Sequence, residues 1–460
     1  MQRDYELLGA TVALCPHCLA RLDGKIIARE GRVYLSRHCP EHGPQLDLLE
    51  EDRDYFQARD LYTKPATSGG IQTALRHQCP FDCGLCPNHE QHTCIALIEI
   101  TGACDLNCPV CYADGHDPSM LPLDTFRRML DFVIETEGGA LDILQLSGGE
   151  PSLHPELEAM ITFARARGVK FVLLNTNGLR LGREPEFRDM LAGFPDRFEV
   201  YLQFDGLSQA AHLQLRGQAL AEAKLETLAA LSASQIPTTL VMSVAAGVNE
   251  SEIGPTTVRA LQTPFVRGVS FQPLAYFGRL PPSQIQRTER ITLSGVIRRL
   301  EAQMKGMIRA EQLTPLPCDV DRVAIGYFHK AADGSFAPVA TRPEVRASLG
   351  QIQNTLRFSP EELLAAGPLP GCSGTACCGG LADKVRQFLP QSFFSTRSLA
   401  EKARIVSETT FRITINSFVD AYNFELRSCQ RECVHVITTD LKKIPFSAYN
   451  LYHRARRAVV

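Results

Sequence analysis

Short apolar runs alternate with amphipathic stretches along the middle of the chain. Runs rich in β-branched and apolar residues predict strands at 95–101, 141–147, 169–176, 198–206, 238–246 and 269–275. Between them, apolar residues recur at helical spacing, as in Phe126, Met129, Leu130 and Val133, with Asp124 as the expected cap and Gly138 as the expected end. Strand–helix units in series favour parallel strands. The pattern therefore predicts an α/β fold with a partial (β/α)6 barrel.

Candidate catalytic residues directly follow the first two predicted strands. Cys104, Cys108 and Cys111 have the spacing C-x3-C-x2-C directly after the first strand, and Ser147-Gly-Gly-Glu-Pro151 follows the second. Barrels of this kind place their active sites at the carboxyl ends of the strands. So short a loop can wrap three thiolates round a 4Fe-4S cluster, whose fourth iron finds no cysteine nearby. An open coordination position is typical of catalytic metal sites.

The two motifs together resemble the radical S-adenosylmethionine (SAM) enzymes. The resemblance implies that the free iron binds SAM, which is cleaved reductively to a 5'-deoxyadenosyl radical. The expected cofactor-binding residues are Tyr112, Gly148, Gly149, Glu150, Asn175 and Asn177. Tyr112 would contact adenine, the glycines would allow a close backbone approach, and Glu150 would accept a hydrogen bond from the ammonium group of SAM.

Several of these segments also have an ordinary structural interpretation. Gly-Gly-Glu-Pro and Asn175-Thr-Asn-Gly178 are sequences that form turns at strand ends without any ligand. Gln203, Asp205 and Gln272 end other predicted strands and are candidates for the same rim. Each motif alone is therefore weak evidence for a SAM-binding site, and the evidence lies in their combination.

A second cysteine group repeats the catalytic spacing. Cys79, Cys83 and Cys86 also read C-x3-C-x2-C, and Cys94 follows as a fourth thiolate. Four thiolates close a cluster, so these residues predict an auxiliary 4Fe-4S cluster that relays electrons or supports the fold. The alternative is a second SAM-binding cluster on Cys79, Cys83 and Cys86.

The N-terminal cysteines predict a mononuclear metal site. Cys15-Pro-His-Cys18 and Cys39-Pro-Glu-His42 form two knuckles with the spacing of a zinc ribbon or a rubredoxin-like site. Zinc is the default for three sulfurs and a nitrogen, and iron remains an alternative. Basic residues here are interleaved with acidic ones, which favours a structural docking role over nucleic-acid binding.

The C-terminal region carries more cysteines than one cluster needs. They are Cys318, Cys372, Cys377, Cys378, Cys429 and Cys433. Some are expected to be buried, inert thiols, which is the ordinary fate of a free cysteine.

Three segments resemble one branch of the superfamily more closely. They are the N-terminal knuckles, the stretch from Cys79 to Cys94, and Ile444-Pro-Phe-Ser-Ala-Tyr-Asn450. They resemble the archaeal tetraether lipid synthase group, also called pterin methyltransferases. That group implies a rubredoxin-like site, a radical SAM cluster and two further 4Fe-4S clusters. Ser447 stands where members usually have cysteine, so a ligand of the C-terminal cluster is missing. Either Cys372, Cys377, Cys378 or Cys429 substitutes for it, or that cluster is altered or absent. The retained Cys318 and Cys433 are the favoured ligands there.

These features predict four regions. Residues 1–60 form a zinc-ribbon or rubredoxin-like unit, and residues 61–94 are a linker with an auxiliary cluster segment. Residues 95–286 form the radical SAM core, and residues 287–460 form a cysteine-bearing C-terminal domain. Small metal-binding units thus flank the barrel at both ends.

The composition of the chain limits the classes of binding partner that we expect. Basic and acidic side chains number 48 and 51, which gives no electrostatic footprint for nucleic acid. No stretch is apolar enough to span a membrane and the N-terminus lacks a signal region, so we expect a cytoplasmic protein. Peripheral membrane contact is left open. The cluster requires an electron donor such as a ferredoxin or a flavodoxin.

The leading functional hypothesis is activation of an unreactive C–H bond, with carbon–carbon bond formation on a lipid-like substrate. A radical SAM methyltransferase acting on a pterin or similar small molecule is the alternative. A lipid predicts a long apolar tunnel, whereas a pterin predicts a short pocket with amide or carboxylate partners. A non-catalytic iron-sulfur electron carrier is the alternative of another class.

Overall fold

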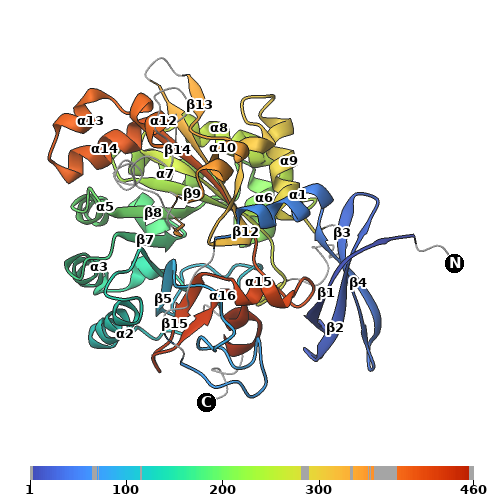
Figure 1. The fold of residues 1–460 in the computed structure, drawn as a ribbon. Coiled ribbons are helices and arrows are strands. Elements are labelled where there is room, and N and C mark those ends of the chain that lie inside the picture. The colour runs from blue at the N-terminus through green and yellow to red at the C-terminus, as the bar shows by residue number, and fades with distance from the viewer. Residues whose placement is uncertain are drawn as a thin grey trace.

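The chain folds into a small N-terminal sheet beside a large curled sheet (Figure 1). The structure is a computed structural model that describes residues 4–64, 70, 72–113, 117–280, 290–331, 335–350, 352, 354–356 and 381–454. Cys372, Cys377 and Cys378 lie outside the described residues, as do residues 65–69 and 71 of the expected linker and residues 281–289 round the expected boundary.

The N-terminal sheet has four antiparallel strands in sequence order. They are β1 (Glu6–Leu14), β2 (Arg21–Arg29), β3 (Arg32–Cys39) and β4 (Gly43–Glu50), followed by α1 (Arg53–Ala58) and the 3-10 turn η1 (Arg59–Tyr62). The end of β4 is anchored on helix α9 (Leu293–Gln303), where Arg298 Nη2 donates to Glu51 at 2.7 Å and Ser294 Oγ donates to Glu50 at 2.7 Å. The sheet is therefore docked on the barrel rather than tethered loosely.

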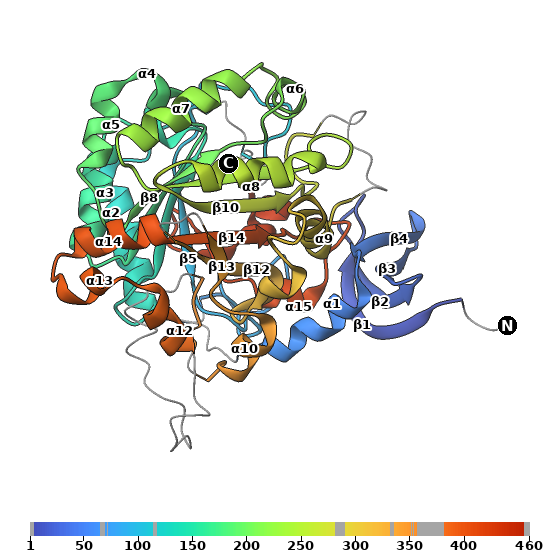
Figure 2. The same ribbon diagram turned by 90° about the horizontal axis from the view of Figure 1, so that it is seen from above.

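All six predicted barrel strands are present and pair in parallel. They are β5 (Ile95–Thr101), β6 (Ile143–Gly148), β7 (Phe171–Thr176), β8 (Phe198–Gln203), β9 (Thr238–Val244) and β10 (Val266–Pro273). Helices connect successive strands and cover the outer face of the sheet (Figure 2). The α/β fold with a partial barrel is confirmed.

The connecting elements follow the predicted amphipathic stretches. They are α2 (Leu123–Thr136), η2 (Pro151–Leu153), α3 (Leu157–Ala166), α4 (Leu179–Arg183), α5 (Pro185–Ala192), α6 (Gln209–Arg216), α7 (Ala221–Ala233), η3 (Glu250–Glu252) and α8 (Ile253–Gln262). Phe126, Met129, Leu130 and Val133 are buried against the strands. Helix α2 begins one residue before Asp124, with Pro122 as its cap, so Asp124 lies in the first turn, where its charge favours the helix dipole.

C-terminal strands extend the sheet at both edges. Beyond β10 come β14 (Thr410–Asn416), parallel, and then β12 (Asp319–Lys330), antiparallel, flanked by β11 (Thr314–Leu316) and β13 (Phe336–Pro338). Beyond β5 come β15 (Val434–Ile437) and β16 (Lys443–Pro445). The boundary expected near residue 286 therefore does not interrupt the sheet.

The other C-terminal elements are short. They are η5 (Ala310–Gln312), α10 (Arg342–Ala347), α12 (Leu381–Phe388), α13 (Gln391–Ser395), α14 (Leu399–Thr409), α15 (Leu426–Gln430), α16 (Phe446–Ala448) and the π-turn η6 (Tyr449–His453). Across the described residues, no helix has the length and apolarity needed to cross a bilayer.

Candidate active site

The cysteine loop lies on the rim formed by the carboxyl ends of the parallel strands. Cys104, Cys108 and Cys111 line one pocket of about 140 Å³ together with Glu150 and Asn175. Cys108 is buried and the other two cysteines are half-buried. Burial raises the pKa of the Cys104 thiol to about 12 and raises that of Cys111. Thiols in this setting become thiolates when they bind a cation.

Two glycines allow the second motif to pack directly on this loop. Gly148 has φ +131°, a region that residues with a Cβ rarely adopt, and a Cβ there would collide with the carbonyl oxygen of Thr101. A Cβ on Gly149 would collide with the carbonyl of Ala103. The close approach is held by hydrogen bonds from Gly149 N to Thr101 O at 2.8 Å and from Glu150 N to Ala103 O at 2.7 Å.

Glu150 is buried and ties two strand ends together. Its Oε1 accepts from Ser152 N at 3.0 Å and from Thr176 Oγ1 at 2.6 Å, and its Oε2 accepts from Asn177 N at 2.7 Å. Burial raises the pKa of Glu150, and these donors oppose the rise. Since each carboxylate oxygen can accept two hydrogen bonds, Oε2 retains capacity for one more donor.

The two asparagines at the end of β7 have different surroundings. Asn177 Nδ2 donates to Asp105 Oδ1 at 2.6 Å and its Oδ1 accepts from Leu179 N, so its side chain braces the cysteine loop. Asn175 is half-buried on the pocket wall, where it donates to Ser147 Oγ at 3.2 Å and accepts from Gln203 Nε2 at 3.0 Å. Asn175 is thus the better placed of the two to meet a ligand.

Tyr112 lines the same pocket among other aromatic rings. Its ring meets Phe446 edge-on at 5.4 Å between centroids and Phe277 at 6.4 Å, and the Arg454 guanidinium lies 5.8 Å from its centre. Burial raises the pKa of the Tyr112 phenol, and a hydrogen bond with Ser147 opposes the rise. Such an apolar wall suits the expected contact with a flat ring.

One charged residue of the site, Arg216 at the end of α6, was not predicted from the sequence. It forms a two-point ion pair with Asp205, Nε–Oδ2 at 2.6 Å and Nη2–Oδ1 at 2.9 Å, and donates to Gln203 and Ser243 at 3.2 Å each. Burial opposes ionisation of Asp205, but the Arg216 charge outweighs it and holds the Asp205 pKa below its usual range. Arg216 also interacts with Cys108, which sets a fixed positive charge beside the cysteines.

The fourth member of the second cysteine group is Cys429, not Cys94 as the sequence predicted. Cys79, Cys83 and Cys86 lie with Cys429 of α15 in one buried cluster, in which Cys83 and Cys429 interact directly. Cys94, expected to be the fourth member, lies instead with Cys318 and Cys433. The reason is strand pairing, since Cys94 N donates to Cys433 O at 2.9 Å where β5 meets β15.

The N-terminal residues come together as expected. The ligand atoms of Cys15, Cys18, Cys39 and His42 all lie within 4.8 Å of one another. Ser447, by contrast, is bonded to Glu432, with Ser447 Oγ donating to Oε1 at 2.9 Å and accepting from Val419 N at 3.0 Å.

Comparison with known proteins matches both parts of this arrangement. The protein-family model of the radical SAM superfamily matches residues 98–257. The family model of the HMPTM N-terminal zinc ribbon domain matches residues 7–51. The 7,8-dihydro-6-hydroxymethylpterin dimethyltransferase of Methanocaldococcus jannaschii is 27% identical, over 96% of this chain and 94% of that protein.

Other similarities cover less. The GTP 3',8-cyclase of a Synechococcus strain is 32% identical over 28% of this chain and 37% of its own length. The structure of SuiB from Streptococcus suis is 14% identical over 47% of this chain and 46% of that chain, with a TM-score of 0.39. The chain thus carries a radical SAM domain at residues 98–257, behind a zinc ribbon at residues 7–51.

Proposed function

We propose that this radical SAM enzyme transfers a methyl group to a pterin or a similar small nitrogen heterocycle. The observation that carries the proposal is the pocket on the cysteine rim, which is small and whose largely apolar wall includes several amide and hydroxyl side chains. Asn175, Gln203, Ser243 and Gln272 all contribute to it. The Methanocaldococcus jannaschii relative, which this chain matches over nearly its whole length, is a dihydropterin dimethyltransferase, and this supports the same substrate class.

The residues on the rim fit a cluster with one open corner. Three thiols face a common pocket, and Glu150 and the backbone of Gly149 border the same space. When bound there, a 4Fe-4S cluster and SAM would supply a 5'-deoxyadenosyl radical. Cys104, Cys108 and Cys111 would hold the cluster, Glu150 would accept from the SAM ammonium group, and Tyr112 would border the adenine.

The amide side chains suit a heterocycle that both donates and accepts hydrogen bonds. Asn175 and Gln203 are linked to each other and to Arg216, so their orientations are fixed in advance. Prior fixing of polar groups lowers the entropic cost of binding and selects ligands whose donors and acceptors match. The Arg216–Asp205 ion pair would keep this network rigid while the substrate binds.

The remaining metal sites are assigned supporting roles. Cys79, Cys83, Cys86 and Cys429 supply four thiols, which would close an auxiliary 4Fe-4S cluster and leave no corner for a second SAM. Such a cluster would relay electrons from a donor such as a ferredoxin or a flavodoxin. The zinc ribbon would act as a structural unit docked on α9, with zinc as its ion.

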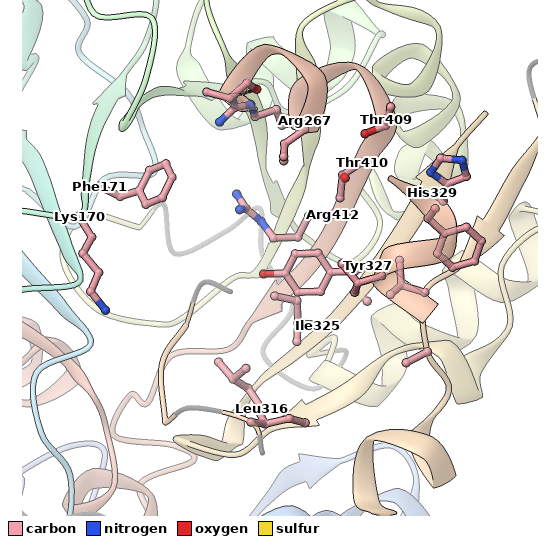
Figure 3. Close-up of a pocket in the computed structure, with 18 of the residues that line it drawn as sticks. Lys170, Phe171, Arg267, Leu316, Ile325, Tyr327, His329, Thr409, Thr410 and Arg412 are labelled. Carbon is pink, nitrogen blue, oxygen red and sulfur yellow. Dashed lines mark hydrogen bonds between the residues drawn. The ribbon is translucent and has the colours of Figure 1, made fainter. Parts of the chain in front are cut away.

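A lipid-like substrate is the second candidate, and one observation favours it. A mostly apolar cavity of about 560 Å³ opens where the parallel strands begin, at the end of the barrel opposite the cysteine loop. Phe171, Tyr327 and Arg412 point into it (Figure 3). Phe388 also lines it. A hydrocarbon chain fits such walls, but radical chemistry on that chain would require it to reach the far rim.

The test is turnover with each substrate class. Anaerobically reconstituted protein is given SAM, a strong reductant and either a dihydropterin with a deuterated one-carbon donor or a deuterated lipid extract. The proposal expects 5'-deoxyadenosine in both, with deuterium transfer and a methylated product only in the pterin reaction. Deuterium transfer from lipid alone would favour the second candidate. Release of no 5'-deoxyadenosine would leave a non-catalytic electron carrier, and Cys111→Ala is the matched negative control.

A further inference from the structure

Three buried cysteines from distant parts of the chain meet outside the active site. Cys94 lies directly before β5, Cys433 directly before β15, and Cys318 in the turn between β11 and β12. Each is at most 1% exposed, and their sulfur atoms lie within 4.8 Å of one another. They pack with Leu316 and Ile325 in one apolar cluster. Buried thiols gathered this tightly from separate segments are typical of metal ligands.

The position of these cysteines in the fold is unusual. In the order of the large sheet, β12 and β5 are separated by β14 and the remaining barrel strands. The sheet curls, so the strands near its two ends, β12 and β5, approach each other across the open part of the barrel. The three cysteines meet at this place. Cys318 comes from one side, and Cys94 and Cys433 come from the other. A metal at this place would hold the two sides of the barrel together.

The spacing of the ligand atoms fits a single ion. With metal–sulfur bonds of about 2.3 Å, two thiolates on one tetrahedral ion lie about 3.8 Å apart. Cys433 Sγ and Cys318 Sγ are 3.8 Å apart. The zinc ribbon provides an internal standard, because its Cys18 and Cys39 sulfurs are 3.9 Å apart. Thiolates that hold a 4Fe-4S cluster bind different irons and lie farther apart once the cluster is bound. Close sulfurs are not sufficient to assign a single ion, because Cys83 also contacts Cys79 and Cys429; the Cys94 site differs in that all three of its ligand atoms lie within 4.8 Å of one another.

The two motifs with cluster spacing differ from this site. Among the described residues, only the zinc ribbon and the Cys94 site bring three or more ligand atoms within 4.8 Å of one another. Cys104, Cys108 and Cys111 do not form such a group. The resemblance to the tetraether synthase group implies a further 4Fe-4S cluster, but Ser447, at the position of its usual cysteine, is bonded to Glu432 and Val419.

A histidine beside the thiols can complete the coordination. His92 Nε2 lies 3.6 Å from Cys94 Sγ, the same as the distance between His42 Nδ1 and Cys15 Sγ in the zinc ribbon. On the other side of the ring, Nδ1 is 3.8 Å from a carboxylate oxygen of Glu137. Metal-bound histidines commonly donate their second N–H to a carboxylate, which fixes the ring. Nε2 is also 2.6 Å from Asn354 O, so the ring must turn toward the other two thiols to bind.

We propose that Cys94, Cys318, Cys433 and His92 bind one tetrahedral Zn²⁺ or Fe²⁺ ion. The ion is a structural cross-link that joins β12 to β5 and β15 where the parallel strands begin. Three sulfurs and one nitrogen form the ligand set that structural zinc sites use. Glu137 lies 3.8 Å from His92 Nδ1, so it can accept from this nitrogen once the ring turns toward the thiols. Lys443, which donates to Glu137 Oε1 at 2.7 Å, holds Glu137 in place. This inference does not depend on the proposed methyl transfer.

The proposed ion can be tested first on the wild-type protein, without any variant. The protein is isolated anaerobically after growth with ⁵⁷Fe, and its metals are measured by metal analysis and Mössbauer spectroscopy. The expected result is two ions outside clusters per chain, zinc or high-spin ferrous, beside about eight cluster irons in two 4Fe-4S clusters. A third 4Fe-4S cluster, with about twelve cluster irons, would overturn the proposal. A single ion outside clusters would also overturn it.

Variants then locate the second ion. Cys318→Ser and His92→Ala are each expected to lose one of the two ions while both clusters keep their spectra. His329→Ala, which removes a histidine from the far end of β12, is the matched control and should retain both ions. If Cys318→Ser fails to fold, His92→Ala gives the answer through its zinc or ferrous content. Full retention of both ions in His92→Ala would remove this histidine from the site and contradict the proposed ligand set.

Discussion

The Arg216–Asp205 ion pair gives a sharp prediction, because one partner is completely buried. Asp205 has no exposed side-chain area and Arg216 retains 14%. With contacts of 2.6 and 2.9 Å and an effective dielectric constant of about 20, their gross attraction is about 6 kcal/mol. Arg216→Met removes the cation and leaves a buried carboxylate. Breaking such a pair typically lowers the free energy of unfolding by about 3–5 kcal/mol.

The pH dependence distinguishes this cause from a loss of packing. In the wild-type protein the pKa of Asp205 is depressed, so the pair contributes fully above about pH 3.9, and the contribution is lost as the pH falls further. Without Arg216, burial raises the Asp205 pKa. The variant should therefore become less stable as the pH rises above about 3.9, by about 1.4 kcal/mol per pH unit until Asp205 ionises.

The assay is denaturant unfolding followed by circular dichroism between about pH 5 and about pH 8. The difference in unfolding free energy between wild type and Arg216→Met should widen with pH. Adding Asp205→Asn to Arg216→Met is the control, since it removes the buried charge and should abolish the widening. A constant difference across this range would refute the electrostatic reasoning, and no difference at all would refute the role of the pair.

Three further predictions follow from the same contacts. Gly149→Ala should abolish 5'-deoxyadenosine release while the iron content stays near wild type, because the added Cβ collides with the Ala103 carbonyl. Cys429→Ser should lower the iron content by about four per chain, measured by colorimetric iron analysis, and leave SAM binding intact. Lys443→Met should lower the free energy of unfolding by about 3 kcal/mol in a denaturant titration, because the Glu137 carboxylate loses its buried cation.

The barrel and its catalytic loop could be predicted because their signals are local. Each strand is a short apolar run, and Cys104, Cys108 and Cys111 fall within one loop after the first of them. The same holds for the zinc ribbon, whose knuckles lie at the ends of paired strands. Periodicity and short spacings carry this information without any knowledge of the tertiary fold.

The partition of the other cysteines could not be predicted, because it depends on pairing between distant strands. Cys94 is eight residues from Cys86 but is placed beside Cys433 by the parallel pairing of β5 with β15. Cys429 and Cys433 are near neighbours in sequence, yet they belong to different groups. Arg216 was also missed, since a charged residue at a helix end is ordinarily solvent-exposed.

The central claim is that Cys104, Cys108 and Cys111 hold a cluster whose open corner binds SAM. The most direct measurement is the electron paramagnetic resonance spectrum of the reduced protein before and after SAM is added. The account predicts that SAM changes the cluster signal in the wild-type protein and that Cys111→Ala lacks this change. A wild-type signal that is identical with and without saturating SAM would contradict the claim.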